Sequence, residues 1–169
     1  MGTLESLLLG FSVALQPDVL WYAFLGCLVG TIVGVLPGTT RPDEYVLYSA
    51  HWDHLGICEP VNGDNICNGA LDNASGTAQL LEIAKGFSAL PTKPARSIMF
   101  VALTGEEKGL IGAKYFATNP PVPLANVLAN INMDGAQTKG PTRDLEVIGY
   151  GNSTIDNLAA AILKKSNRV

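Results

Sequence analysis

The sequence is poor in charged residues and in cysteine. Only 15% of its 169 residues are charged, and the eleven Lys and Arg residues are scattered, with Lys164 and Lys165 as their one adjacent pair. This excludes the basic stripe that would neutralise a row of nucleic-acid phosphates. Three cysteines are too few for a disulfide framework and lack the CxxC spacing of a thiolate zinc site. Cys58 and Cys67 either pair in an oxidising compartment or remain free thiols.

One long stretch contains no charge at all. Residues 19–40 form an uncharged, largely apolar run of 22 residues, and no Lys or Arg precedes it as in a signal peptide. As a helix rising about 1.5 Å per residue it would match a hydrocarbon core of about 30 Å. We therefore expect a retained transmembrane helix. Gly26, Gly30 and Gly34 would share one of its faces, where they either admit a partner helix or fall at this spacing by chance.

The beginning of the chain has a second membrane-like feature. An apolar stripe beside Glu5 predicts an interfacial helix; it consists of Leu4, Leu7, Leu8, Phe11 and Leu15. The segment MGTLESLLLGFSVALQPDVLWYAFLGCLVGTIVGVLPG, residues 1–38, resembles the amino terminus of the large membrane subunit of tripartite tricarboxylate transporters. We expect a membrane segment over residues 1–40, in a bacterial inner membrane, and a separate domain over residues 41–169. Arg41 alone does not decide on which side of the membrane that domain lies.

The rest of the chain alternates short apolar strands with helical stretches, which is typical of a layered α/β sheet. Its length fits one domain. Apolar runs predict strands over residues 45–50, 97–103, 127–132 and 145–148. Helical spacing of apolar residues predicts a helix from Ser75 through Phe87, and further helices over residues 109–118 and 153–165.

A histidine follows the first of these strands, in the motif AHWDH. Open α/β sheets place their binding crevices at such strand ends, and the imidazole of His51 suits zinc. Asp53, two residues on, could accept the other ring N–H and so fix the tautomer. Taken alone, His51 is more often a hydrogen-bonded structural histidine. We assign His54 to that structural role.

Four carboxylates stand at comparable positions. Asp72 precedes a helix that Ser75 could cap, so it is either a capping residue or a bridge between two zinc ions. Adjacent Glu106 and Glu107 are either solvated, or divided between binding a metal and taking a proton from water. Asp134 ends an apolar strand, either as a turn residue or as a ligand.

Together, the motifs AHWDH, GALDNASG, FVALTGEEKG and ANINMDG resemble the di-zinc aminopeptidases of peptidase family M28 in order and spacing. The resemblance spans nearly all of residues 42–149 and is incomplete toward residue 169. It implies a partial zinc-exopeptidase fold, a three-layer α/β/α sandwich with a mixed, mostly parallel sheet. It also implies the roles of the site residues. His51 and Asp134 would bind one zinc ion, Glu107 would bind the second, and Asp72 would bridge the two. Glu106 would be the general base, and Asp53 would accept the other ring N–H of His51.

The expected function is a membrane-tethered zinc aminopeptidase that removes single residues from the free amino terminus of peptides. The family uses a further histidine ligand downstream of Asp134, and this sequence has only His51 and His54. We therefore expect weak binding of the second zinc, and a chimeric or truncated reading frame. The alternatives are a non-catalytic peptidase-like binding module, a membrane component that packs on a partner helix, and a related zinc hydrolase such as a carboxypeptidase or deacylase.

Overall fold

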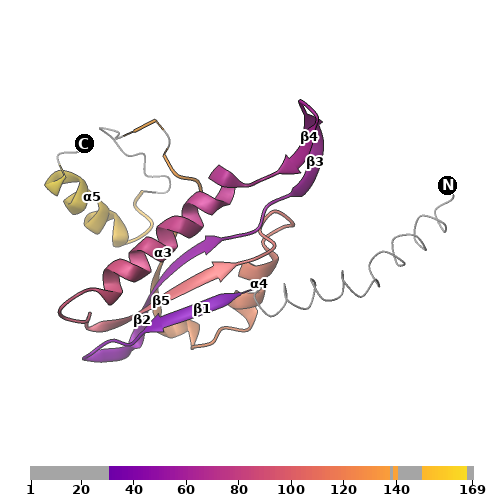
Figure 1. Ribbon diagram of the computed structural model, residues 1–169. Helices are drawn as coiled ribbons and strands as arrows, with labels where there is room; N and C mark the ends of the chain where they lie inside the picture. Colours follow the sequence, from indigo (N-terminus) through magenta and orange to yellow (C-terminus); the bar gives the residue numbers. More distant parts are fainter. Residues whose placement is uncertain (1–30, 138, 141–149, 167–169) are drawn as a thin grey trace. The chain divides into compact units, whose positions relative to one another are not determined.

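The computed structural model describes residues 31–137, 139–140 and 150–166 (Figure 1). The chain divides into two compact units, one ending at Ala136 and the other beginning at Gln137. All of the residues that the sequence singles out for chemistry lie in the first unit. The predicted strand over residues 145–148 lies outside the described residues.

The first unit is built on a four-stranded mixed sheet with the order β1-β5-β2-β6. The central strand β2 (Arg41–His51) runs parallel to β5 (Arg96–Leu103) and to β6 (Val127–Asn132). Only β1 (Ile32–Leu36) is antiparallel, and it pairs with β5. The mixed, mostly parallel sheet expected from the sequence is confirmed.

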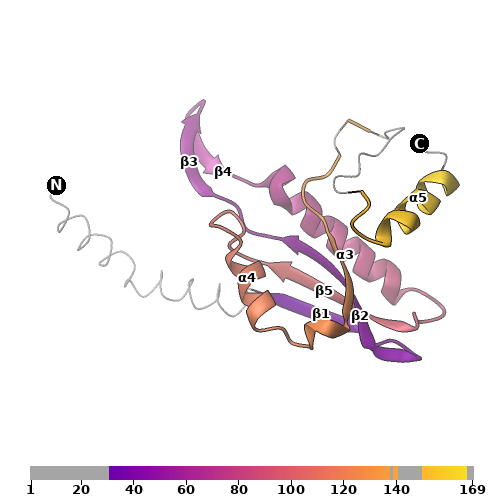
Figure 2. The same cartoon turned by 180° about the vertical axis from the view of Figure 1, so that it is seen from behind.

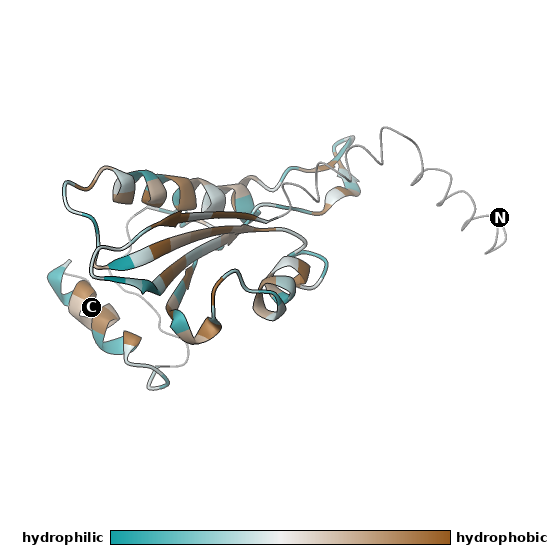
Figure 3. Ribbon diagram, turned by 90° about the horizontal axis from the view of Figure 1, so that it is seen from below, coloured by the Kyte–Doolittle hydropathy of each residue, from teal (hydrophilic) through white to brown (hydrophobic). Residues whose placement is uncertain are grey.

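Helices cover both faces of this sheet. Helix α3 (Ser75–Ser88) lies on one face and α4 (Ile111–Thr118) on the other, as Figures 1 and 2 show from opposite sides. Because side chains alternate along a strand, the central strands β2 and β5 contribute to two cores, one on each face. The core under α3 contains Ala50, Leu80, Ile98, Phe100 and Met133, and the opposite core contains Leu47, Met99 and Val101. Seen edge-on, the apolar strands lie between the helical layers (Figure 3).

A hairpin that the sequence analysis missed follows β2. Strands β3 (Gly56–Val61) and β4 (Asp64–Cys67) pair antiparallel and extend away from the main sheet (Figure 1). They are joined through Asn62 and Gly63, both with positive φ, as a tight hairpin turn requires. A disulfide between Cys58 and Cys67 closes the hairpin, which settles the alternative left open above. The hairpin leads into the short helical segment η1 (Ala70–Ala74) and then α3.

Strand β1 corrects the predicted transmembrane helix. Its residues pair with Ile98 to Ala102 of β5, so Gly34 lies in a strand and not on a helix face with Gly26 and Gly30. The rest of the uncharged run, residues 19–30, lies outside the described residues. Ile32, Val33 and Val35 stay partly exposed in this edge strand, and apolar composition alone does not separate such a strand from a membrane helix. None of the described helices has both the length and the apolar character that crossing a bilayer requires.

The remaining helices are short or belong to the second unit. A turn of 3-10 helix, η2 (Leu124–Asn126), leads into β6. The second unit contains α5 (Ile155–Lys165), close to the helix predicted over residues 153–165. At its start the Gly151 N–H donates to the Asp156 carboxylate at 2.7 Å. The predicted interfacial helix and the residues Gly26 and Gly30 lie outside the described residues.

Candidate metal centre

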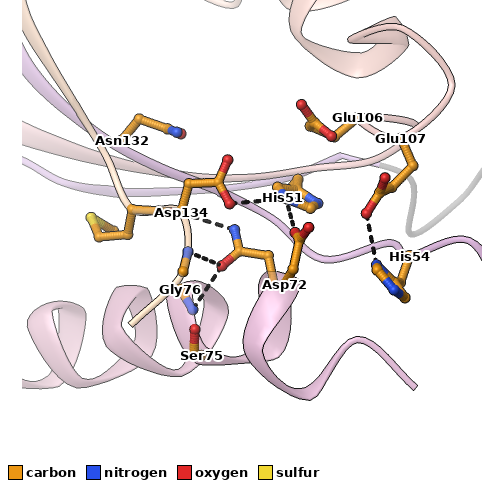
Figure 4. Close-up of polar contacts among 12 residues, drawn as sticks. His51, His54, Asp72, Ser75, Gly76, Glu106, Glu107, Asn132 and Asp134 are labelled. Carbon is orange, nitrogen blue, oxygen red and sulfur yellow. Dashed lines mark hydrogen bonds and ion pairs between the residues drawn. The ribbon is translucent and has the colours of Figure 1, made fainter. Parts of the chain in front are cut away.

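The polar residues of interest gather at the carboxyl ends of the parallel strands. His51 is the last residue of β2, Glu106 and Glu107 follow β5, and Asp134 follows β6. Parallel strands end at the same edge of a sheet, so these three loops meet. Asp72 joins them from η1, at the start of the connection to α3. Figure 4 shows the side chains of all four segments facing one another.

A first cluster forms around the imidazole of His51, which is only 3% exposed. Its Nε2 lies 3.0 Å from the Asp72 Oδ1 and 3.3 Å from the Asp134 Oδ1 (Figure 4). The backbone of His51 is also tied to α3, because the Thr77 hydroxyl donates to the His51 carbonyl at 3.0 Å. The side chains of His51, Asp72 and Asp134, from three separate segments, form one candidate ligand group.

The other ring nitrogen of His51 faces Asp53, but not as the sequence suggested. Nδ1 lies 3.2 Å from the Asp53 backbone carbonyl and 3.6 Å from its carboxylate. A carbonyl can only accept, so the proton belongs on Nδ1 and leaves the Nε2 lone pair facing the carboxylates. The Asp53 carboxylate accepts the backbone N–H of Glu106 at 3.2 Å. Asp53 therefore links His51 to the loop that carries the glutamates.

A second cluster contains His54, which the sequence analysis assigned to a purely structural role. Its Nδ1 lies 2.7 Å from the Glu107 Oε1, and both side chains are largely buried (Figure 4). With Asp72 they form a second group whose donor atoms all lie within 4.8 Å of one another. Asp72 thus belongs to both groups. No local signal marks His54, because Glu107 is 53 residues away in the sequence.

The donors of both groups fit zinc. Each group offers one imidazole nitrogen and two carboxylate oxygens, which are donors that zinc commonly takes. Ligands arranged tetrahedrally at about 2.0–2.1 Å from an ion lie roughly 3.3 Å from one another. The two contacts of His51 Nε2, at 3.0 and 3.3 Å, match that spacing. A carboxylate shared by both groups is also what a pair of neighbouring divalent ions requires.

The acidic surroundings also act on the titration of His51. Burial lowers the pKa of the His51 imidazole, but the neighbouring carboxylates of Asp134 and Glu106 and the hydrogen bonds to Asp134 and Asp53 raise it by more. The pKa is therefore above its ordinary value. A cluster that favours a cationic ring is also one that favours a bound cation.

Asn73, which the sequence analysis did not single out, connects the two aspartate loops. Its side chain is buried, and its amide nitrogen donates to the Met133 carbonyl at 3.0 Å. Its amide oxygen accepts the backbone N–H groups of Gly76 at 2.9 Å and Gly135 at 3.2 Å (Figure 4). Asn73 follows Asp72 directly, and so it sets the position of Asp72 relative to the loop of Asp134.

Ser75 has a different task from the helix cap expected of it. Its hydroxyl donates to the Leu71 carbonyl at 2.6 Å and accepts the Ala136 N–H at 2.9 Å. The capping contact at the start of α3 comes instead from Asn73, whose side chain accepts the Gly76 N–H. The loop after β6 is therefore held to α3 at two successive points.

A cavity of about 270 Å³ opens beside the first cluster. His51, Glu106 and Asp134 lie in its wall, so it is adjacent to the candidate ligands. Its lining is mixed: it includes the polar residues Ser49, Thr104, Asn130 and Asn132 and the apolar residues Leu103, Leu110 and Ala113. Ser49 Oγ is within hydrogen-bonding distance of both asparagine side chains, at 3.0 and 2.8 Å. The cavity could thus receive a polar chain beside the cluster.

Comparison with known proteins decides the family. The model of peptidase family M28 matches residues 31–169. This chain belongs to peptidase family M28. The match includes residues 31–38, which the sequence analysis had assigned to the transporter-like segment, in agreement with the position of β1 in the sheet.

Relatives of this M28 chain are peptidases by name, and one of them is named a zinc metalloprotease. A "Probable zinc metalloprotease" of Pyrenophora tritici-repentis is 39% identical over 106 residues, covering 63% of this chain and 24% of the relative. "Aminopeptidase NAALADL1" of Mus musculus is 38% identical over 108 residues, covering 61% and 13%. The crystal structure of a peptidase M28 precursor from Shewanella amazonensis SB2B superposes with a TM-score of 0.59 at 30% identity, covering 82% and 29%. The M28 chain thus spans less than a third of each of these proteins.

Proposed function

We propose that this chain is a zinc-dependent aminopeptidase. The observation that supports this most directly is the sharing of Asp72 between two groups of one histidine and two carboxylates. Separate segments converge there at the strand ends, beside a cavity large enough for part of a peptide. The names of the relatives, a zinc metalloprotease and an aminopeptidase, agree with this chemistry.

In the proposed site, His51 and Asp134 would hold one zinc ion and Glu107 a second, and Asp72, which belongs to both groups, would contribute to each. Zinc, when bound, lowers the pKa of a coordinated water toward neutrality and polarises the carbonyl of the scissile bond. Glu106 accepts the proton of the attacking water and returns it to the leaving amine. Asp53 supports that step, because its carboxylate holds the Glu106 backbone N–H at 3.2 Å.

The proposed substrate has a free amino terminus. Asp72 and Asp134 are about half exposed, so the cluster is open to an incoming peptide end. The adjacent cavity offers Ser49 and Asn132 as polar partners for the first peptide unit.

The decisive experiment measures release of a chromophore from amino-acid anilides by the full 169-residue chain. We expect hydrolysis that a chelator stops, that zinc restores, and that Glu106→Ala lowers by about three orders of magnitude or more. Glu82→Ala is the matched control, because that carboxylate is 74% exposed on α3 and away from the cluster. Activity that is indifferent to both the chelator and Glu106→Ala would contradict the proposal.

One observation favours a second candidate, a peptidase-like module that binds peptides without cleaving them. His54 and Glu107 already satisfy each other through a 2.7 Å hydrogen bond, so that cluster is stable without an ion. Elemental analysis of the purified chain separates the two candidates. Less than one zinc per folded chain, with retained peptide binding, supports the module.

Membrane attachment is a further part of the proposal, restricted to the residues before β1. Sedimentation of the full chain with bacterial inner membranes, before and after an alkaline wash, tests it. Recovery of the whole chain in the wash would argue against insertion, and recovery in the pellet would support it.

A further inference from the structure

We propose that His54 is itself a metal ligand and completes the second ion position together with Asp72 and Glu107. The inference rests on the proposed two-ion function and adds to it the missing donor. The sequence holds only two histidines, and His51 belongs to the first position. Within this sequence, the second group takes its imidazole from His54.

The arrangement of the three side chains supports this role. The donor atoms of His54, Asp72 and Glu107 lie within 4.8 Å of one another, against roughly 3.3 Å between two ligands of one zinc ion, so small side-chain movements would bring all three to a single ion. The side chains of His54 and Glu107 are only 22% and 16% exposed, whereas that of Asp72 is 55% exposed. The group therefore has two anchored donors and one open side through which an ion and a substrate can enter.

The backbone around His54 brings the Asp72 segment unusually close. A Cβ atom on Gly69 would lie 2.7 Å from the Cβ of His54 and 2.9 Å from its Cγ. Gly69 also has a φ of 64°, a conformation that favours glycine. The absence of a side chain at this position therefore lets the start of η1 pack directly against the imidazole.

The disulfide-closed hairpin explains how the two segments meet. At its base Gly56 pairs with Cys67, so the residues just before β3 and just after β4 lie side by side. His54 is two residues before that pair and Gly69 is two residues after it. The disulfide between Cys58 and Cys67 fastens the same end of the hairpin. The paired and disulfide-bonded base of the hairpin thus keeps His54 beside the loop of Asp72.

The rival explanation is that His54 only orients Glu107 through their hydrogen bond. Their 2.7 Å separation is a hydrogen-bond length, whereas two ligands of one zinc ion would lie roughly 3.3 Å apart. Coordination thus requires the proton to move from Nδ1 to Nε2 and the two side chains to separate by about half an ångström. The two explanations differ in whether Nδ1 bonds to the metal.

Nuclear magnetic resonance can observe that bond directly. The full chain, with isotopically labelled histidine rings, is loaded with a magnetically active isotope of cadmium in place of zinc. Because there are only two histidines, only two ring systems contribute, and the His54→Gln variant identifies one of them. We expect cadmium coupling at His51 Nε2 and at His54 Nδ1. A His54 ring without coupling, in a chain that holds two cadmium ions, overturns the inference.

Metal titration provides the second measurement. His54→Gln should lower the zinc affinity of the second position by roughly 100-fold or more and leave the affinity of the first position within about twofold of the wild type. Glu107→Gln should have the same effect. Glu82→Gln, with a carboxylate far from the cluster, should change neither affinity, and circular dichroism verifies that each variant is folded. An unchanged second zinc in folded His54→Gln, or a wild-type chain that binds only one ion, overturns the inference.

These outcomes separate the inference from the proposed function. A chain that shows His54 coupling and binds two ions but hydrolyses no anilide keeps the His54 ligand and loses the aminopeptidase. If the chain hydrolyses anilides, a chelator stops the reaction, and His54 shows no cadmium coupling, the proposed aminopeptidase stands and the His54 ligand is lost.

Discussion

The side-chain amide of Asn73 donates a 3.0 Å hydrogen bond to the backbone carbonyl of Met133, 60 residues further along the chain. Asn73 follows Asp72, and Met133 precedes Asp134, so this bond joins the two loops whose carboxylates contact His51. Met133 is also part of the core beneath α3. The candidate site is therefore fastened to the packed interior of the domain at this point.

Replacing Asn73 should damage both stability and metal binding. Asn73→Ala leaves the buried N–H of Gly76 and the Met133 carbonyl without their partner and also removes the acceptor of the Gly135 N–H, which should cost about 2–3 kcal/mol. Urea unfolding measures the loss, and zinc titration should show weaker binding at the first position. Asn157→Ala, on the exposed surface of α5, should stay within about 0.5 kcal/mol of the wild type. Equal stability of the two variants would show that the Asn73 contacts are dispensable.

Gly69 should not tolerate a side chain. In Gly69→Ala the new methyl group would meet the Cβ of His54 at 2.7 Å, on a backbone with positive φ. We expect loss of the second zinc and a drop of about 1–2 kcal/mol in unfolding free energy. Gly86→Ala is the matched control, since nothing lies within 4 Å of its added Cβ and it stands within α3, where alanine is favoured. A Gly69→Ala chain that binds zinc normally would contradict the close packing described above.

Reduction of the disulfide should act on the second ion position more than on the first. Opening the Cys58–Cys67 bond releases a short loop and should lower the unfolding free energy by about 2–3 kcal/mol. Because the hairpin base positions His54, zinc affinity at the second position should fall, while the group around His51 keeps its own anchors. Thermal melts and zinc titrations with and without reductant measure both effects. The reductant should have no effect on a variant in which both Cys58 and Cys67 are replaced by serine.

The stability of the metal-free protein should depend on the protonation of His51. The carboxylates that face it belong to Asp53, Asp72, Glu106 and Asp134, and its pKa in the folded state is raised. A raised folded pKa contributes stability that is fully present below the ordinary pKa of the ring and is lost as pH rises through the folded value. In the presence of chelator, unfolding should therefore require less urea near pH 8 than near pH 6.

Two variations complete this experiment. The difference between the two pH values should shrink in His51→Gln, which cannot acquire a charge. If His51→Gln shows a pH difference of the same size, the pH dependence of stability comes from other titratable groups.

Much of the fold follows from short-range patterns in the sequence. The strands over Tyr45–Ala50, Ser97–Leu103 and Val127–Asn132 lie within β2, β5 and β6, because continuous apolar runs of strand length predict buried parallel strands. Helix α3 begins at Ser75, as the helical spacing of its apolar residues predicts. Strand β1 escaped this reasoning because its apolar residues continue a longer uncharged run, and composition alone does not separate lipid from sheet.

The site was less predictable than the fold, for a physical reason. His51, Asp72, Glu107 and Asp134 could be singled out because each stands at the end of a predicted element. His54 and Asn73 could not, because what distinguishes them is a partner 53 or 60 residues away. The hairpin that brings His54 to Asp72 has mostly exposed residues, so it leaves no strong apolar pattern in the sequence.

Both imidazoles come from one strand end, with His54 three residues after His51. A small displacement of this strand end would therefore move both nitrogens together. An ion that binds at one position restrains the segment that serves the other, so the second ion loses less conformational entropy on binding. This coupling opposes the repulsion that arises because Asp72 brings the like charges of the two ions close together.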